Sequence, residues 1–381
     1  MKARVIAFYL PQYHPIPEND EWWGKGFTEW TNVGKAKPLF KGHYQPRVPA
    51  DLGYYDLRMP EIREAQADMA REAGIEGFCY WHYWFSTKKQ LLERPFTEVL
   101  TSGKPNFPFC LGWANHNWTN KSWEVGTRRV KEQTLMEMVY NDEEYINHFY
   151  DVLPAFKDQR YITVDGKPLF LVWRPLDIPD PNHFVDLWTE LAHENGLMGI
   201  HFVGIAYNLN SQDKNLKNLL FHRFNNAAKE MYNDVLNMGF DAVNSRGYNL
   251  AEYKALSIRH LAWRRIAAFF KFSPISKCDQ SRINKYLYVE QDRWENVYPT
   301  LLPNWDRSPR SGAKARIYIN STPAVFKKQV ESAIELVKNK ANEHKIIFLQ
   351  SWNEWAEGNY VEPDLKYGHG FLDILKSTIF E

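Results

Sequence analysis

Short apolar runs alternate with longer amphipathic stretches along almost the whole chain. The amphipathic stretches have apolar residues at helical spacing, for example over residues 60–73, 142–156, 181–194 and 324–339. The apolar runs have the length and composition of buried parallel strands. Eight such runs occur, at residues 4–9, 77–84, 107–113, 168–173, 200–206, 239–243, 297–302 and 345–351.

Eight strands that alternate with helices predict an α/β protein, a single (β/α)8 TIM barrel over residues 1–381 with long loops on its C-terminal face. Residues 164–167 predict a hairpin that leads into the fourth strand. Residues 15–51 form a first connection rich in Trp, Gly and Pro, and a connection of this length is more often functional than passive. An insertion at about residues 245–295 is the second departure from the repeat.

The insertion contains a basic amphipathic stretch at residues 258–271. This stretch fits either peripheral contact with a membrane or a helix that caps the barrel, and we favour the cap. No run reaches the length of a membrane span, so we expect no integral membrane segment. The N-terminus lacks a signal-peptide core, and Cys79, Cys110 and Cys278 lack metal-ligand spacing. We therefore expect a reducing, cytoplasmic location.

Charge and aromatic content narrow the function. The chain has 47 Lys and Arg against 46 Asp and Glu, a net charge of +1, which argues against nucleic acid as a partner. The chain has 15 tryptophans, which is an unusually high number. If they served packing alone, they would lie along strand interiors and helix faces. Most of them instead lie at or beyond the predicted strand ends, namely Trp22, Trp23, Trp30, Trp81, Trp84, Trp113, Trp118, Trp123, Trp305, Trp352 and Trp355.

The active site of a TIM barrel lies at the carboxyl ends of its strands, and here the residues that follow the strands combine rings with hydrogen-bonding side chains. An aromatic face attracts the C–H groups of a sugar ring, while amides, imidazoles and carboxylates bind its hydroxyls. Any single ring is more often a packing residue, and Glu29 is more simply a structural loop residue. The set as a whole predicts a carbohydrate site formed by Tyr9, Gln12, His14, Trp22, Trp23, Glu29, Trp30, Trp81, His82, Tyr83, Trp84, Trp113, Asn115, Asn117, Trp118, Trp305, Asp306, Trp352, Asn353 and Trp355.

Glu354 and Glu357 are the candidate catalytic residues. Residues three apart point to opposite faces of a strand, so the chain must turn after Glu354 if both face one pocket, and Gly358 fits such a turn. Glycosyl transfer needs one group that protonates the departing oxygen and another that acts as base or nucleophile. Two close carboxyls titrate as a coupled pair, which keeps one protonated near neutral pH. The alternative is a pair of solvated loop glutamates.

Other chemistries have weaker support. Asp306 is either a further catalytic carboxylate, a ligand for sugar hydroxyls or part of an Asn-Trp-Asp turn. The spacing of His14, His82, His116 and Glu357 matches no known metal motif, and phosphate-loop and dinucleotide glycine patterns are absent from the sequence. We therefore expect no metal and no cofactor.

Several long motifs resemble a known family. Residues 8–33, 43–47, 77–85, 92–95, 113–118 and 351–358 are similar to the WbsX-like proteins, which are found with bacterial polysaccharide and O-antigen genes and are often labelled glycosyltransferases. That group is similar in turn to the endo-α-mannosidases and endo-α-mannanases of glycoside hydrolase family 99, which have a (β/α)8 barrel and a comparable Asn-Glu-Trp-x-Glu-Gly segment. The resemblance implies that Glu357 is the general acid. It also implies that Glu354 is a base acting on the 2-hydroxyl, with retention through a 1,2-anhydro sugar.

Three functions follow as hypotheses. The leading one is a metal-independent, retaining glycoside hydrolase that acts within a bacterial polysaccharide or oligosaccharide. The second is a glycosyltransferase in O-antigen, capsule or lipopolysaccharide biosynthesis, although the sequence has neither an Asp-x-Asp metal motif nor an evident diphosphate cradle. The third is a non-catalytic carbohydrate-binding barrel, which leaves the proximity of the two glutamates without a reason.

Overall fold

A closed barrel of eight parallel strands forms the centre of the computed structural model, which describes residues 1–120, 133–206, 224–255 and 275–380. Residue Trp123 and the basic stretch at 258–271 lie outside the described residues. Strand β1 pairs with both β14 and β2, which closes the barrel. The strands are β1 (Arg4–Tyr9), β2 (Ile75–Ser86), β4 (Phe109–Trp113), β8 (Lys167–Val172), β9 (His201–Ala206), β10 (Ala242–Ser245), β12 (Val297–Leu301) and β14 (Ile346–Leu349).

Each of these strands overlaps one of the eight predicted apolar runs, so the predicted TIM barrel is confirmed. The strands are buried from both sides, and every residue of β4, β9, β10, β12 and β14 is buried. This burial explains why the sequence shows continuous apolar runs and not a period of two. Close packing also restricts Gly77 in β2, because a Cβ atom there would lie 2.3 Å from the carbonyl oxygen of Pro108.

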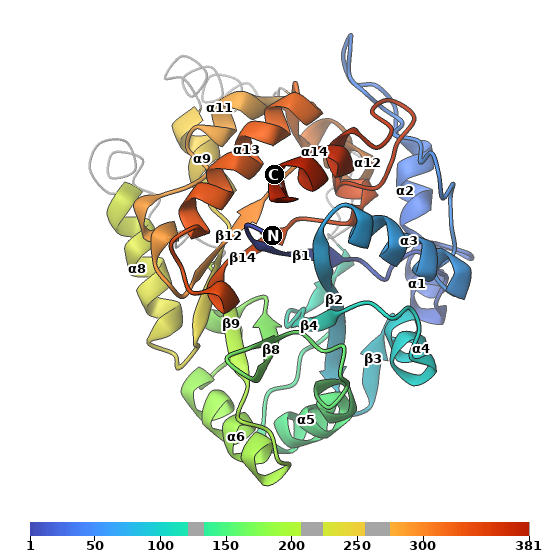
Figure 1. Ribbon diagram of the computed structural model, residues 1–381. Helices are drawn as coiled ribbons and strands as arrows, with labels where there is room; N and C mark the ends of the chain where they lie inside the picture. Colours follow the sequence, from blue (N-terminus) through green and yellow to red (C-terminus); the bar gives the residue numbers. More distant parts are fainter. Residues whose placement is uncertain (121–132, 207–223, 256–274, 381) are drawn as a thin grey trace.

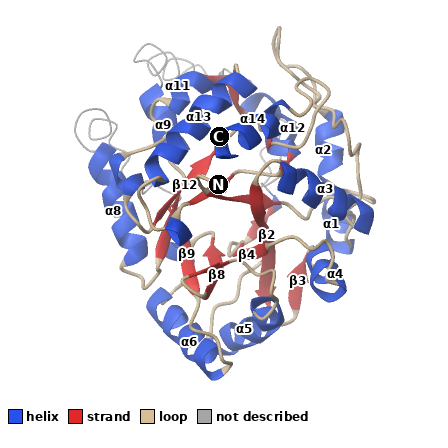
Figure 2. Cartoon of the chain, in the orientation of Figure 1, coloured by secondary structure: helices blue, strands red, loops and turns tan. Residues whose placement is uncertain are grey.

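Helices surround the strands on the outside (Figures 1 and 2). The predicted helices form at the expected places, and Thr322 shows how one of them begins: its hydroxyl accepts the Val325 N–H, and Pro323 occupies the first helical position. The helices are α1 (Pro17–Trp23), α2 (Glu29–Lys35), α3 (Pro60–Glu72), α4 (Arg94–Ser102), α5 (Asp142–Phe156), α6 (Pro181–Glu194), α8 (Phe224–Leu236), α9 (Tyr248–Ala255), α11 (Gln280–Asn284), α12 (Ser308–Ser311), α13 (Pro323–Val337) and α14 (Gly370–Phe380).

The two ends of the chain meet at the amino-terminal end of the barrel (Figure 1). The backbone N–H of Lys2 donates to the carbonyl oxygen of Ile379 at 3.1 Å. The predicted hairpin before the fourth strand is confirmed, since β7 (Thr163–Val164) pairs antiparallel with β8. None of the helices in the described ranges is long and apolar enough to cross a membrane.

The described parts of the insertion build a small second layer beside the barrel. Strand β11 (Ser276–Asp279) pairs in parallel with β13 (Arg316–Ile319), which follows the seventh barrel strand. A separate apolar cluster holds this layer together, and it consists of Tyr248, Ala251, Cys278, Ile283, Leu287, Leu302, Trp305 and Tyr318. The insertion and the loop after β12 are therefore packed as one unit.

Small two-stranded ladders extend the loops at the carboxyl end. Strand β2 continues beyond the barrel and pairs with β3 (Lys89–Leu91), while β5 (Trp118–Thr119) pairs with β6 (Thr134–Met136). Strand β15 (Asn353–Glu354) pairs with β16 (Asn359–Tyr360). The loops that follow β2, β4 and β14 are thus held by backbone hydrogen bonds.

Candidate active site

A pocket of about 220 Å³ opens at the carboxyl ends of the barrel strands. Its lining residues lie in or after six different strands, which agrees with the usual position of an active site in this fold. They are Leu10, Gln12, Trp81, Tyr83, Ala114, His116, Trp118, Trp173, Arg307, Arg310, Glu354 and Glu357.

The two glutamates reach this pocket because the chain turns between them. Glu354 ends β15, residues Trp355–Glu357 form one turn of 3-10 helix, and Gly358 follows with a φ of 65°. A Cβ atom at Gly358 would lie 2.8 Å from the backbone nitrogen of Asp306. Both the left-handed backbone and the close approach therefore require glycine at this position. The turn predicted from the spacing is confirmed.

Asp306 holds the same turn through its backbone. Its N–H donates to the carbonyl oxygen of Glu357 at 2.7 Å. Its carboxylate points away from the pocket and accepts hydrogen bonds from Gln45 Nε2 at 2.7 Å and the Ser308 N–H at 2.9 Å, and it also contacts His43 Nε2 at 2.8 Å. These contacts lower the pKa of Asp306, although burial on its own would raise it. Asp306 is thus a support of the turn.

Arg310 connects three glutamates. Its guanidinium contacts Glu29 Oε1 at 2.8 Å, Glu354 Oε1 at 2.9 Å and Glu357 Oε1 at 2.6 Å. The side chain of Arg310 is 8% exposed and that of Glu29 is completely buried. Arg307 adds a second cation, with Nε at 3.1 Å from Glu357 Oε1. Two guanidinium groups therefore face three carboxyl groups, of which Glu29 and Glu354 are buried.

Burial and the two arginines shift the pKa values of the three carboxyl groups in different directions. Burial raises the pKa of Glu354 well above its usual value, and the charges of Glu357 and Glu29 add to this shift, while Arg310 opposes it. Burial raises the pKa of Glu29 as well. For Glu357, burial alone would raise the pKa, but Arg307 and Arg310 outweigh it and the net pKa is lowered. In the site without a ligand, the proton of the pair is therefore favoured on Glu354 over Glu357.

Aromatic rings form the opposite wall of the pocket. Trp81 stacks on Phe8 with 4.9 Å between ring centroids and an interplanar angle of 8°, and the edge of Trp173 packs against it at 4.8 Å. The guanidinium of Arg246 lies 4.4 Å from the centre of the Trp173 ring. Trp118 lies edge-on to Tyr83 at 5.2 Å. These contacts fix the rings in place, so the wall is preformed.

Of the predicted site residues, the pocket brings together Gln12, Trp81, Tyr83, Trp118, Glu354 and Glu357. The first long connection, residues 15–51, does not line the pocket, but two of its residues contact side chains that do. Its Trp22 packs edge-on against Trp118 at 6.1 Å, and Glu29 reaches the site through Arg310.

Several other predicted residues support the loops from beneath. Asn353 exchanges two hydrogen bonds with the backbone of Leu10, at 2.8 and 3.0 Å. Trp355 stacks on Tyr360 at 3.8 Å, and its Nε1–H donates to Glu362 at 2.6 Å. Four more predicted residues are buried or partly buried. Tyr9 donates a hydrogen bond to Gln66, and Trp30 donates one to the Tyr55 carbonyl oxygen. Trp23 packs on Phe27, and Trp352 packs on Phe78.

A further group of predicted residues faces outward from the barrel or into the loops. His82 lies 2.9 Å from His148 of α5, and Trp84 stacks on the same imidazole at 4.8 Å. Trp113 is 1% exposed, and its Nε1–H donates to the carbonyl oxygen of Trp84 at 2.9 Å. The remaining members bind backbone or pack in the second layer, namely Asn115 with the Arg174 N–H, Asn117 with the Met138 N–H, and Trp305 with Tyr248.

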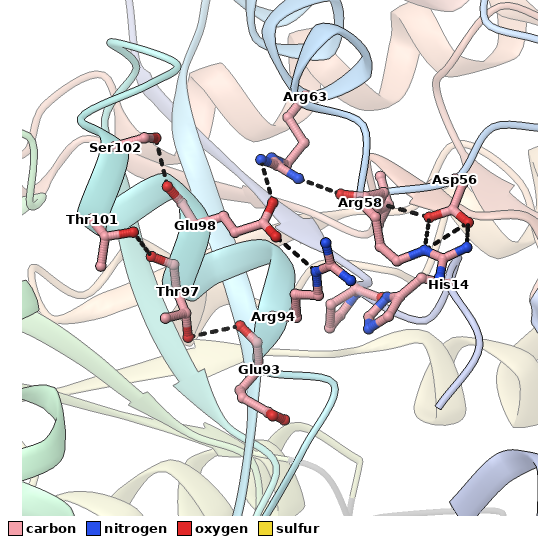
Figure 3. A network of polar contacts seen from close by, with 12 residues as sticks. His14, Asp56, Arg58, Arg63, Glu93, Arg94, Thr97, Glu98, Thr101 and Ser102 are labelled. Carbon is pink, nitrogen blue, oxygen red and sulfur yellow. Dashed lines mark hydrogen bonds and ion pairs between the residues drawn. The ribbon is translucent and has the colours of Figure 1, made fainter. Parts of the chain in front are cut away.

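His14 lies in a separate polar network (Figure 3). Its Nδ1 is 2.9 Å from the carbonyl oxygen of Pro11, and the neighbouring charges are those of Asp56, Arg58 and Arg94. The same network joins α3 to α4, since Arg63 and Arg94 both contact Glu98, at 2.8 and 2.7 Å. Burial lowers the pKa of His14 to about 4, so it is neutral at physiological pH.

The pocket also contains residues that were not among the predicted contacts. Arg307 and Arg310 come from the loop after β12, His116 from the loop after β4, and Trp173 from the end of β8. One signal for the arginines was available in principle, because paired carboxylates that are buried need a nearby cation. Within the described ranges, no group of three or more His, Cys, Asp or Glu side chains is arranged to hold a metal ion.

The fold is similar to that of solved GH99 endo-alpha-mannosidases. The GH99 endo-alpha-mannosidase from Bacteroides thetaiotaomicron is 15% identical with a TM-score of 0.53, and the match covers 99% of this chain and 96% of that one. The same enzyme in complex with BIS-TRIS-propane gives a TM-score of 0.55 at 14% identity over 100% of this chain and 96% of that one. A glycoside hydrolase-like protein gives 0.57 at 15% identity, with coverage of 99% and 94%.

Sequence comparison then places the chain in a family. The model of the family described as Glycosyltransferase WbsX matches residues 5–375, so the chain belongs to the WbsX family. The protein WxcX from Xanthomonas campestris pv. campestris strain ATCC 33913, described as uncharacterized, is 33% identical over 391 residues, and its counterpart in strain B100 matches equally. The alignment covers 100% of this chain and 50% of those proteins, so the chain spans about half the length of the curated relatives it matches.

Proposed function

We propose that the chain is a retaining glycoside hydrolase that cleaves within a bacterial polysaccharide or oligosaccharide. The observation that carries the proposal is the pair Glu354 and Glu357, held on one turn by a single guanidinium and opposite a preformed wall of tryptophans. The fold shared with endo-alpha-mannosidases supports an endo-acting enzyme. A carboxyl pair of unequal pKa provides both an acid and a base.

In the proposed reaction, Glu357 gives its proton to the departing glycosidic oxygen as the C1–O bond breaks. Glu354 takes the proton of the 2-hydroxyl, and O2 forms a bond to C1, which gives a 1,2-anhydro sugar. Water then attacks C1 and loses a proton to Glu357, while the C1–O2 bond breaks and Glu354 returns a proton to O2. Two inversions at C1 give net retention, and both carboxyls end in their starting state.

The charges of the ligand-free site require one additional step in this scheme. Arg307 and Arg310 favour the ionised form of Glu357, whereas burial favours the protonated form of Glu354. Arg307 is the more exposed of the two cations, since its side chain is 39% exposed and that of Arg310 is 8% exposed. We propose that a bound sugar displaces Arg307 and water from Glu357, which raises the pKa of Glu357 and transfers the shared proton to it.

The test is incubation with a panel of bacterial glycans without any nucleotide sugar, followed by measurement of product size and anomeric configuration. We expect shorter fragments with retained configuration. Activity should fall by roughly 10²- to 10⁴-fold in Glu357→Gln and in Glu354→Gln, while glycan binding persists. The matched control is Glu331→Gln, on the exposed face of α13. Undiminished cleavage in both active-site variants would falsify the assigned roles.

A glycosyltransferase is the second candidate, and the description of the WbsX family favours it. It requires an activated sugar donor, so the same panel is repeated with nucleotide sugars. Products that grow in length, and only in the presence of the donor, would select the transferase over the hydrolase. Binding without any change in glycan length, in either arm, would select the non-catalytic carbohydrate-binding barrel.

A further inference from the structure

A second and larger cavity, of about 440 Å³, lies on the far side of Asp306 from the two catalytic candidates. Three segments distant in sequence form it: the first long connection, the β11–β13 layer and the segment that leads into α14. Its volume falls within the range of small-molecule sites. The glycosidase proposal does not use this cavity.

Aromatic rings and ammonium groups alternate around the cavity. Lys277 Nζ lies 4.5 Å from the centre of the Phe40 ring. Lys366 Nζ lies 4.7 Å from the centre of Tyr44 and 4.9 Å from that of Tyr367. Within the described part of the chain, neither ammonium group has a carboxylate within salt-bridge distance. Both lysines are exposed, so their charges remain available to a ligand.

The carboxylates of the cavity wall are already bound by protein donors. Asp306 is held by Gln45 and the Ser308 N–H, with His43 and Arg47 beside it. Asp364 accepts the N–H groups of Lys366 and Tyr367 at 2.9 and 2.7 Å and the hydroxyl of Tyr360 at 2.6 Å. Four cationic residues line the cavity against these two aspartates, which leaves an excess of positive charge.

We propose that this cavity binds an anionic sugar, that is, a sugar ring that carries a carboxylate or a phosphate. The rings of Phe40, Tyr44 and Tyr367 provide surfaces for the C–H face of the sugar, as tryptophans do in the candidate active site. Lys277 and Lys366 provide the charges for the anion. A neutral sugar would leave the excess positive charge without a partner, and an inorganic anion would leave the rings uncovered.

The cavity shares a wall with the catalytic turn. Arg47 lines the cavity, and its Nη1 donates to the carbonyl oxygen of Gly358 at 3.0 Å, next to the bond from the Asp306 N–H to Glu357. The side chains of Glu354 and Glu357 do not line it. The binding of an anionic sugar therefore does not depend on the catalytic carboxyls, and it can be measured whether or not the chain is a hydrolase.

The experiment is isothermal titration of the Glu357→Gln protein with four probes: glucuronate, glucose 6-phosphate, glucose and inorganic phosphate. We expect at least one anionic sugar to bind ten times more tightly than either glucose or phosphate. Glucuronate and glucose 6-phosphate distinguish a carboxylate source from a phosphate source. Binding of phosphate alone, or equal binding of glucose and the anionic sugars, would overturn the proposal.

Two sets of variants test the location. Lys277→Gln combined with Lys366→Gln should weaken the anionic sugar at least tenfold without a change in melting temperature. Lys327→Gln combined with Lys328→Gln, on the exposed face of α13, is the matched control and should leave binding unchanged. Phe40→Leu should reduce the preference for glucose 6-phosphate over phosphate. Equal weakening in both lysine pairs would show a non-specific charge effect and remove the site.

Discussion

The two cavities on either side of Asp306 use charge in opposite ways. In the smaller one, three carboxyl groups and Arg310 are buried together, and the pKa values of Glu354 and Glu357 move apart. In the larger one, Lys277 and Lys366 are exposed above aromatic rings. Buried charges change the pKa values of neighbouring groups, whereas exposed charges mainly attract a ligand of opposite charge. Size is therefore a poor guide here, because the smaller cavity has the groups suited to proton transfer.

The comparison predicts first that substitution of Arg310 lowers the stability of the protein more than the other changes considered below. Arg310→Met removes the cation that pairs with the buried Glu29 and Glu354, so we expect unfolding in urea to show a loss of about 3–5 kcal/mol. Arg58→Met is the control, since Arg58 pairs with Asp56 at the surface, and such pairs contribute about 1 kcal/mol or less.

A second variant keeps this test informative if Arg310→Met does not fold. Combining Arg310→Met with Glu29→Gln removes one of the unpaired carboxyls and should recover part of the lost stability. If Arg310→Met costs no more than Arg58→Met, the idea that buried charge dominates the smaller cavity is wrong.

The next largest effect concerns Glu362, beneath the catalytic turn. Burial raises its pKa from 4.5 to about 7, although Trp355, Gln66 and Tyr55 donate hydrogen bonds to it. The folded state therefore binds this proton more tightly than the unfolded state. The associated stability is complete below pH 4.5 and is lost as the pH rises to about 7, which amounts to about 3 kcal/mol.

Glu362→Gln cannot titrate, so its free energy of unfolding should fall less than that of the wild type between these pH values. Glu331→Gln is the control, because it makes the same substitution at an exposed position of α13. The measurement is urea unfolding at several pH values, and parallel curves for Glu362→Gln and the wild type would contradict the prediction.

The wall between the cavities provides a smaller effect. Gly358→Ala places a side chain at a φ of 65° and 2.8 Å from the Asp306 nitrogen. Gly103→Ala is the matched control, because Gly103 has the same left-handed conformation, with a φ of 73°, and no atom within 4 Å of the added Cβ. We expect roughly 1–3 kcal/mol of backbone strain in both variants and an additional loss in Gly358→Ala from the steric contact. Thermal unfolding measures the loss of stability in each variant. Equal losses would mean that the residues around Gly358 shift to accept the added methyl group without strain.

The smallest effect is a shift in the pH profile of catalysis. If the active form has one proton on the pair, kcat/KM declines below the lowered pKa of Glu357 and above the raised pKa of Glu354. Arg307→Gln removes a cation that lowers both pKa values, so both limbs should move to higher pH, by roughly one pH unit. Arg293→Gln, far from the pocket, should leave the profile in place. If neither limb of the pH profile moves in Arg307→Gln, then Arg307 does not set the pKa values of Glu354 and Glu357.

Much of the fold was predictable because barrel strands are buried on both faces and therefore appear as continuous apolar runs. The turn at Gly358 was predictable as well, since two glutamates three residues apart can share a pocket only if the chain bends. The position of individual rings was not. Trp81 and Trp113 lie at nearly the same level of the neighbouring strands β2 and β4, yet Trp81 lines the pocket and Trp113 is buried against α5 and α6.

The sequence by itself determined the eight barrel strands, their order and the family, because periodicity and motifs are local properties of the chain. Only the tertiary structure decided which charges meet. Glu29, Arg310 and Glu354 are separated by up to 325 positions, and Arg310 contacts both glutamates because the first, seventh and eighth strands are neighbours in a closed barrel. Proton affinity depends on such distances and on burial, and neither is encoded at any single position.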